Sequence, residues 1–295
     1  MLETRREVLN RAIKLHSNSG LPTIKIGCEL EFFLLQKNHE PIRDQEFLQK
    51  LIAKLKENLT SKFSLIYQLE KEQGVSQIEL KTNFTSDLKK LCEEIESAKT
   101  LISHFAKEKN LIESFAAQPF QNDCGNALQF NISLHQNEQN IFDFDKEILN
   151  KIAFKLLSKT NEMLIILAPN KDDYFRFSLE TNLNLFKNGK FTAPINLSFG
   201  FDNRTCAIRI PKSQNSTRLE YRIASASANP FLAIAAILLT IIDDIDCSQK
   251  GDFKQIHGNA FDEQYNLKKL CSSFEQATEL FLKKDNMFKN FFTKK

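Results

Sequence analysis

Apolar side chains recur along the chain at two spacings, and each spacing predicts a different element. Recurrence every three or four residues predicts an amphipathic helix, whereas alternation with polar side chains predicts a strand. The helical spacing is found at about residues 2–15, 45–59, 86–108, 146–167, 230–242 and 267–282. Alternation is found at about residues 24–35, 63–69, 75–82, 112–117, 126–134, 193–200, 206–211 and 218–223. This mixture predicts an α+β fold with a mainly antiparallel sheet.

Two stretches are interpreted from features other than periodicity alone. The most apolar segment, 230–242, follows Asn229 as a helix cap and opens with Pro230. It is shorter than the roughly 18–20 residues that span a bilayer, so we interpret it as a buried helix. Residues 170–191 are polar and aromatic without a clear period, and we predict a loop or flap there. Without internal repeats or long linkers, residues 1–295 are expected to form a single domain.

The composition excludes several classes of protein. The chain has 42% hydrophobic and 26% charged residues, which is typical of a globular protein and not of a disordered one. Its 40 basic and 37 acidic residues leave a net charge of +3 without a long run of one sign, which disfavours nucleic-acid binding. The charged start of the chain does not resemble a signal peptide, so we expect a cytoplasmic protein with no membrane partner. The six cysteines form no CxxC pair and are expected to be buried free thiols.

Glutamates stand inside strands that are otherwise apolar. Glu29 and Glu31 are two residues apart, so strand alternation places both on one face. Like charges on a half-buried surface raise each other's pKa unless something neutralises them, and a divalent cation does so. For a single pair of this kind, a strand with one solvated face is the alternative. The pattern recurs at Glu72 and Glu79, on either side of Gly74, and this recurrence favours a metal site.

Arginines occupy the polar positions of other predicted strands. Arg218 and Arg222 alternate with Glu220 in one strand, and Arg204 and Arg209 accompany another. Carboxylate oxygens suit Mg²⁺ or Mn²⁺, and guanidinium groups suit polyphosphate. Together they indicate nucleotide-dependent phosphoryl transfer. Because the sequence contains no Gly-rich phosphate loop, the site is expected on the face of the sheet.

The same segments resemble the catalytic domain of the glutamine synthetase family, over about residues 4–292. Residues 27–35 are similar to the family's G-x-E-x-E-F-F-L strand, and residues 72–79 to its E-x-x-P-G-Q-x-E segment. Residues 118–134 follow its K-P-F…G…H-x-H-x-S-L stretch, and residues 201–211 its N-R-S-A-x-I-R-I-P segment. Most specific is R-L-E-Y-R at 218–222, followed by A-S-A-N-P-F-L-A at 226–233. The resemblance implies a curved, mainly antiparallel sheet with flanking helices, and a chain without the family's N-terminal β-grasp domain.

The resemblance also implies an activity and a role for each matching residue. The activity is an ATP-dependent carboxylate–amine ligase, in which an acyl phosphate forms on glutamate or a related acid and ammonia or an amine displaces the phosphate. One metal ion, Mg²⁺ or Mn²⁺, would be held by Glu31, Glu72 and Glu79, and a second by Glu29, Glu220 and Gln129. ATP would be bound by Arg204, Arg209, Arg218, Ser133 and Phe84. Catalysis would fall to Arg204, Arg209 and Glu220, and substrate binding to Gly125, Arg222 and Arg176.

Several positions depart from the family's pattern. Gln129 replaces a metal-binding histidine, and an amide oxygen is a poorer ligand for Mn²⁺ than imidazole is. Cys124 replaces an asparagine that contacts glutamate, and Thr192 replaces the glutamate of the flap. Two hypotheses follow: an active ligase with an altered substrate, or a degenerate, non-catalytic nucleotide-binding or regulatory subunit. The expected partners are small-molecule substrates, with the chain either forming a homo-oligomer or associating with a full-length paralogue.

Overall fold

The computed structural model describes residues 4–212, 216–244, 253 and 255–293. Within these residues nine strands form one sheet in the order β2-β3-β1-β5-β9-β8-β7, while β4 pairs with β1 and β6 pairs with β5. Every pair is antiparallel except β7 with β8. The strands are β1 (Thr23–Leu35), β2 (Ile66–Lys71), β3 (Gln77–Thr82), β4 (Ile112–Ser114), β5 (Leu128–Gln136), β6 (Gln139–Asn140), β7 (Phe199–Phe201), β8 (Ile208–Ile210) and β9 (Leu219–Tyr221). The predicted α+β fold with a mainly antiparallel sheet is confirmed.

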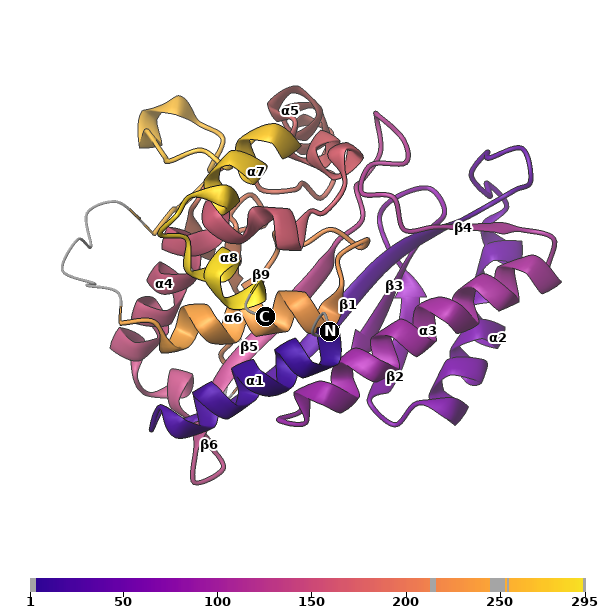
Figure 1. Cartoon of the computed structure of the whole chain (residues 1–295). Helices are drawn as coiled ribbons and strands as arrows, with labels where there is room; N and C mark the ends of the chain where they lie inside the picture. The colour runs from indigo at the N-terminus through magenta and orange to yellow at the C-terminus, as the bar shows by residue number, and fades with distance from the viewer. Residues whose placement is uncertain (1–3, 213–215, 245–252, 254, 294–295) are drawn as a thin grey trace.

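Helices cover one face of this sheet, where α1, α3 and α6 lie across the strands (Figure 1). The helices are α1 (Arg5–Asn18), α2 (Gln45–Lys62), α3 (Leu88–Glu108), α4 (Lys146–Leu167), α5 (Leu179–Lys187), α6 (Pro230–Ile242), α7 (Phe274–Leu282) and α8 (Met287–Phe292), with short 3₁₀ helices at Ile141–Asp143, Lys171–Phe177 and Glu263–Tyr265. Helix α6 begins where the Asn229 side chain accepts hydrogen bonds from two backbone amides, and nearly all of it is buried. Among the described helices, none combines the length and the apolar content that crossing a bilayer requires.

The two faces of the sheet differ in chemistry because side chains alternate along each strand. On β1 the fully buried Leu30 and Phe32 point into the core below the helices, and Glu29 and Glu31 point to the opposite face. The same alternation on β3, β5, β8 and β9 puts further polar residues on that opposite face: Gln77, Glu79, Lys81, Gln129, Asn131, Arg209 and Glu220. The polar face therefore forms the floor of any site that the sheet carries.

The structure corrects three of the predicted elements. Residues 170–191 are not a loop, because they contain the 3₁₀ helix Lys171–Phe177 and helix α5. Helix α5 is explained by local signals, since the Ser178 hydroxyl caps its start and Gly189, with a φ of +66°, follows its end. The strand expected at 193–200 is confined to β7, and the helix expected from residue 267 begins only at Phe274, where Ser273 caps it.

The other elements follow the sequence pattern closely. The predicted helices 146–167 and 230–242 have the bounds of α4 and α6. Strand β6 and helix α8 were not predicted, because segments of two and six residues are too short to show a strand or helix periodicity. The expectation of buried free thiols is confirmed for five cysteines, and the sixth, Cys247, lies outside the described residues. The five are Cys28, Cys92, Cys124, Cys206 and Cys271.

Candidate active site

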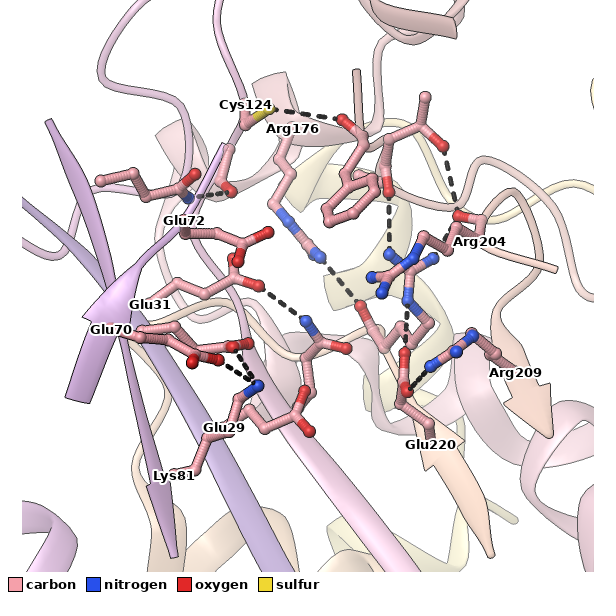
Figure 2. Close-up of a pocket in the computed structure, with 18 of the residues that line it drawn as sticks. Glu29, Glu31, Glu70, Glu72, Lys81, Cys124, Arg176, Arg204, Arg209 and Glu220 are labelled. Carbon is pink, nitrogen blue, oxygen red and sulfur yellow. Dashed lines mark hydrogen bonds and ion pairs between the residues drawn. The ribbon is translucent and has the colours of Figure 1, made fainter. Parts of the chain in front are cut away.

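A cavity of about 350 Å³ lies on the polar face of the sheet (Figure 2). Strands β1, β2, β3, β5, β8 and β9 contribute side chains to it, and loops and a 3₁₀ helix close it from above. Its lining consists of Glu29, Glu31, Glu70, Glu72, Gln77, Glu79, Lys81, Cys124, Gly125, Gln129, Arg176, Phe191, Thr192, Ala193, Arg204, Arg209, Arg218, Glu220 and Arg222. Almost all of these side chains are polar or charged, so the cavity suits an ionic ligand.

Strand register assembles the acidic side of the cavity. Glu31 on β1 lies opposite Glu79 on β3, and Glu79 in turn lies opposite Glu70 on β2. Glu29 lies between Lys81 and Gln129 on its two neighbouring strands. We call the carboxylates of Glu29, Glu31, Glu70, Glu72 and Glu79 the acidic wall. Like charges placed directly opposite one another destabilise a sheet, so this arrangement needs a compensating cation.

The opposite side of the cavity is basic. Arg209 comes from β8, Arg218 and Arg222 flank β9, and Arg176 and Arg204 come from segments that cover the site. We call these five arginines the basic wall, and Figure 2 shows Arg204 and Arg209 across the cavity from Glu29, Glu31, Glu70 and Glu72. The two walls are far apart in the sequence and meet because β5 pairs with β1 on one side and with β9 on the other.

Glu220 belongs to neither wall because arginines already hold it. Its Oε2 lies 2.5 Å from Nη1 of Arg209, and its Oε1 lies 3.2 Å from Nε of Arg222. Arg209 also reaches Asp202 at 3.0 Å, and Asn131, opposite Glu220 on β5, links Arg218 to Glu29 by hydrogen bonds of 2.9 and 3.1 Å. This chain of contacts fixes the basic wall relative to the floor of the cavity.

Four of the five carboxyls of the acidic wall resist ionisation, and the fifth, Glu70, has its pKa lowered by its hydrogen bond with Lys81. Burial raises the pKa of Glu31 to about 7, and the nearby Glu72 adds to the effect, although Arg176 opposes it. Burial and the neighbouring Glu29, Glu31 and Glu72 raise the pKa of Glu79 well above its ordinary value. The pKa values of Glu29 and Glu72 are also raised, primarily by burial. Raised pKa values are expected where several carboxyl groups lie close together and no full positive charge compensates them.

Glu31 and Gln129 are oriented toward each other. One Glu31 oxygen accepts a hydrogen bond from Nε2 of Gln129 at 2.6 Å, and the other accepts one from the Ala127 amide at 2.8 Å. This leaves the Gln129 Oε1 buried without a hydrogen-bond partner. A buried unsatisfied acceptor facing a cavity is costly, and a cation or donor in the cavity would satisfy it.

Lys81 is the one cation on the acidic wall among the residues that line the cavity. Its Nζ lies 2.6 Å from Oε1 of Glu70 and 2.9 Å from Oε2 of Glu79. Burial lowers the pKa of Lys81, but Glu79 and the hydrogen bonds to Glu70 and Glu79 outweigh it and raise the pKa above its ordinary value. Lys81 is therefore an ammonium ion at neutral pH.

The donor set of the cavity fits Mg²⁺ or Mn²⁺, although the side chains are not yet arranged around one. Within the described residues, no group of three or more His, Cys, Asp or Glu side chains is already placed to hold a metal ion. The reason lies in the contacts above, since Glu31, Glu79 and Glu220 are each turned toward a protein donor. Oxygen ligands, raised carboxyl pKa values and the unsatisfied Gln129 oxygen are nonetheless what a hard divalent cation requires.

Two arginines brace the segments above the cavity. Arg222 donates to the carbonyls of Arg204, Cys206 and Thr192, and Arg176 donates to the carbonyls of Arg222 and Ile223. Burial lowers the pKa of Arg176 to about 10, with Glu31 opposing the shift. Both guanidinium groups are thus fixed in place before any ligand arrives.

Residues 191–193 line the cavity beside Arg204. The Arg204 guanidinium stacks over the Phe191 ring at 3.8 Å, and the Thr192 hydroxyl donates to the Arg204 carbonyl at 3.2 Å. The thiol of Cys124 donates to the Phe191 carbonyl, and burial raises its pKa to about 12, so it is not a thiolate nucleophile.

The structure brings together most of the residues that the sequence nominated. All six nominated metal ligands line the cavity, as do Arg204, Arg209, Arg218, Gly125, Arg222 and Arg176. Ser133 and Phe84, nominated for nucleotide binding, do not line it, since Ser133 bonds to Lys25 and His135 and Phe84 packs beside Gly27. Sequence reasoning missed Glu70 and Lys81. Strand alternation could have placed Lys81 on the face of Glu79, but Glu70 lies beyond the predicted strand 63–69 and its pairing with Glu79 comes from the register.

The sequence is similar to that of known proteins over most of its length. The family model for the glutamine synthetase catalytic domain matches residues 3–295. The chain is 25% identical over 289 residues to gamma-glutamylputrescine synthetase PuuA of Escherichia coli, covering 88% of this chain and 58% of that protein. It is 29% identical to the glutamate–methylamine ligase of Methyloversatilis universalis over 264 residues, again 58% of that protein and 81% of this chain. The chain thus spans less than two thirds of these relatives.

Solved structures agree on the fold. The structure titled GmaS/ADP complex superposes with a TM-score of 0.77 at 20% identity, covering 94% of this chain and 67% of that one. Plasmodium falciparum glutamine synthetase superposes with a TM-score of 0.76 at 17% identity, covering all of this chain and 74% of that one.

Proposed function

The chain belongs to the glutamine synthetase family, and from that premise we propose that it joins an acid to ammonia or an amine at the expense of ATP. The observation that carries the proposal is the acidic wall facing the basic wall across one cavity. Phosphoryl transfer depends on neutralising and positioning negative charge, and these two walls provide both functions. Relatives named as ligases that act on glutamate support the same class of reaction.

The proposed reaction has two steps. A carboxylate oxygen of the acid attacks the γ-phosphorus of ATP, the bond to the β–γ bridging oxygen breaks, and ADP leaves. The nitrogen of the amine then attacks the acyl carbon, the carbon–oxygen bond to phosphate breaks, and a proton is lost from nitrogen. The product is an amide, together with ADP and phosphate.

The basic wall is suited to the anionic groups in these steps. Arg204 stacks on Phe191 and Arg209 is paired with Glu220, and both would offset charge on the transferring phosphoryl group. Arg218, held by Asn131, would contact the nucleotide phosphates. Arg222 and Arg176, together with Gly125, would shape the end of the cavity that takes the amino-acid substrate.

The cavity offers two groups of ligands for the divalent cations that ATP-dependent ligases use. Glu31, Glu72 and Glu79 would supply one group of ligands, and Glu29, Glu220 and the Gln129 oxygen the other. A bound Mg²⁺ or Mn²⁺ would supply positive charge to the phosphates. The protein's own part is to keep these carboxylates together despite their repulsion and to exclude water from around them.

The proposal is tested by incubating the chain with ATP, Mg²⁺ or Mn²⁺, glutamate and a panel of amines that includes ammonia, methylamine and putrescine. We expect phosphate release that requires both acid and amine, and a product mass equal to their sum minus water. Arg209→Lys provides a matched control that retains charge but not the paired geometry with Glu220 and Asp202. A folded chain that binds ATP and forms no product with any pair would refute the proposal.

A second candidate is a non-catalytic nucleotide-binding or regulatory subunit. It is favoured by Gln129, whose amide group faces Glu31 with its nitrogen and not with its oxygen, and by the neutral Thr192 in the cavity lining. This candidate predicts ATP binding without turnover, together with capture of a full-length paralogue. Product formation by the isolated chain would exclude it.

A further inference from the structure

Lys81 is built into the acidic wall from the strand itself. It stands directly opposite Glu29 in the register of β1 and β3, so its side chain must share the polar face with Glu29 and Glu31. Figure 2 shows its amino group among the carboxylates of this wall. With its side chain 27% exposed and Glu79 only 6% exposed, the ion pair faces the cavity and not bulk water.

Other residues hold Lys81 in this place. Glu70 binds the ammonium with Oε1 and accepts a hydrogen bond from Gln68 with Oε2 at 3.1 Å. Gln68 in turn accepts a hydrogen bond from Lys56 at 2.5 Å. This series of contacts runs from the surface of α2 to the cavity, so the position of the ammonium does not depend on Glu79 alone.

The ammonium and a divalent cation would compete for the same carboxylate. Glu79 is one of the three glutamates that the family resemblance assigns to one metal ion, and its Oε2 is already paired with Lys81. A second cation at Glu79 would have to bind beside a fixed positive charge. On the other side of the site, Glu220 is paired with Arg209 and Arg222, whereas Glu29 accepts a hydrogen bond from the neutral amide of Asn131.

We propose that the Lys81 ammonium takes the place of a divalent cation at Glu79, so that the chain binds one metal ion tightly and not two. This inference rests on the proposed function for the presence of any metal. It makes Lys81 the residue that sets the metal stoichiometry of this site.

The test is Mn²⁺ binding to the full chain without nucleotide, measured by equilibrium dialysis and by the electron paramagnetic resonance signal of free Mn²⁺. The wild-type chain is expected to bind one tight equivalent. Lys81→Gln, which keeps hydrogen-bond donors and removes the charge, is expected to bind a second equivalent, with at least a tenfold gain in affinity at that second position. Lys81→Arg retains the charge and should keep the wild-type stoichiometry. Lys25→Gln is the matched control, because Lys25 lies on the same face of β1 but pairs with the exposed Glu138 outside the cavity.

Each outcome decides the inference. Two tight equivalents in the wild-type chain, or one in a folded Lys81→Gln chain, would overturn it and leave the ligase proposal intact. No Mn²⁺ binding by any chain would overturn both. If circular dichroism shows that Lys81→Gln is unfolded, Lys81→Met takes its place, and the wild-type stoichiometry still tests the inference directly.

Discussion

Replacing Glu31 by Gln should stabilise the metal-free chain at neutral and higher pH. Glu31 is 7% exposed, and burial together with Glu72 raises its pKa from 4.5 to about 7. Below pH 4.5 the carboxyl is protonated in both the folded and the unfolded chain, so it costs nothing. Between pH 4.5 and about 7 the carboxyl ionises in the unfolded chain but stays protonated in the folded chain, so the free energy of unfolding falls as the pH rises, and above about pH 7 the full cost is present.

The magnitude follows from the two pKa values. The difference between 4.5 and about 7 corresponds to about 3 kcal/mol of folding free energy at about pH 8. Glu31→Gln removes this cost and keeps both hydrogen bonds if Gln129 turns its amide over, since Gln129 Oε1 has no partner at present. In a chain of this length the gain corresponds to a rise of about 5 °C in Tm.

Glu94→Gln is the matched control because Glu94 is equally buried but lies outside the cavity. Its carboxylate accepts hydrogen bonds from the amides of Ser64 and Leu65 and from the Ser64 hydroxyl. Weakening of these hydrogen bonds should destabilise the chain by about 1.5–3 kcal/mol. Thermal and urea unfolding at about pH 5 and pH 8, with chelator present, measure both variants. If Glu31→Gln destabilises the chain at pH 8 as Glu94→Gln does, the acidic wall is not strained as described.

Three further predictions concern the same cavity. Saturating Mn²⁺ should raise Tm more at pH 8 than at pH 5.5, because protons compete with the metal for the carboxyls. At a Mn²⁺ concentration about 100 times Kd the gain in the free energy of unfolding is about 2.7 kcal/mol, which differential scanning calorimetry measures. An equal rise in Tm at both pH values would contradict the raised pKa values. Arg209→Ala should reduce ligation about 100-fold in a coupled phosphate assay, and unchanged turnover would argue against its role at the phosphoryl group. Gly125→Ala should cost about 1–3 kcal/mol by urea unfolding, because its Cβ would lie 2.6 Å from the Ala117 carbonyl oxygen; an unaffected midpoint would show that the loop yields.

The sequence was sufficient for the parts of the site that lie on strands. Alternation in 24–35 placed Glu29 and Glu31 together, and the same rule placed Arg218, Glu220 and Arg222 on one face. The pairing of distant strands was not available from periodicity, so the register that sets Glu31 against Glu79 came only with the structure. The family resemblance supplied the missing link between these strands.

The parts that failed were governed by tertiary contacts or by short local signals. Helix α5 has a cap at Ser178 and a terminating Gly189, but its aromatic and polar composition hid its period. The segment before α7 looked helical, yet Lys269 instead forms an isolated bridge with Asn196. Lys81 escaped notice because a lysine on a strand is usually a solvated side chain, and only Glu70 on the neighbouring strand reveals its role.

The position of β5 in the sheet has a consequence for biosynthesis. This strand joins β1, near the start of the chain, to β9, which is complete only at Tyr221. A growing polypeptide therefore carries the glutamates of β1 to β3 long before the arginines that oppose them have been translated. A product that ends before Tyr221 would therefore carry the acidic wall without β9 and the arginines that flank it.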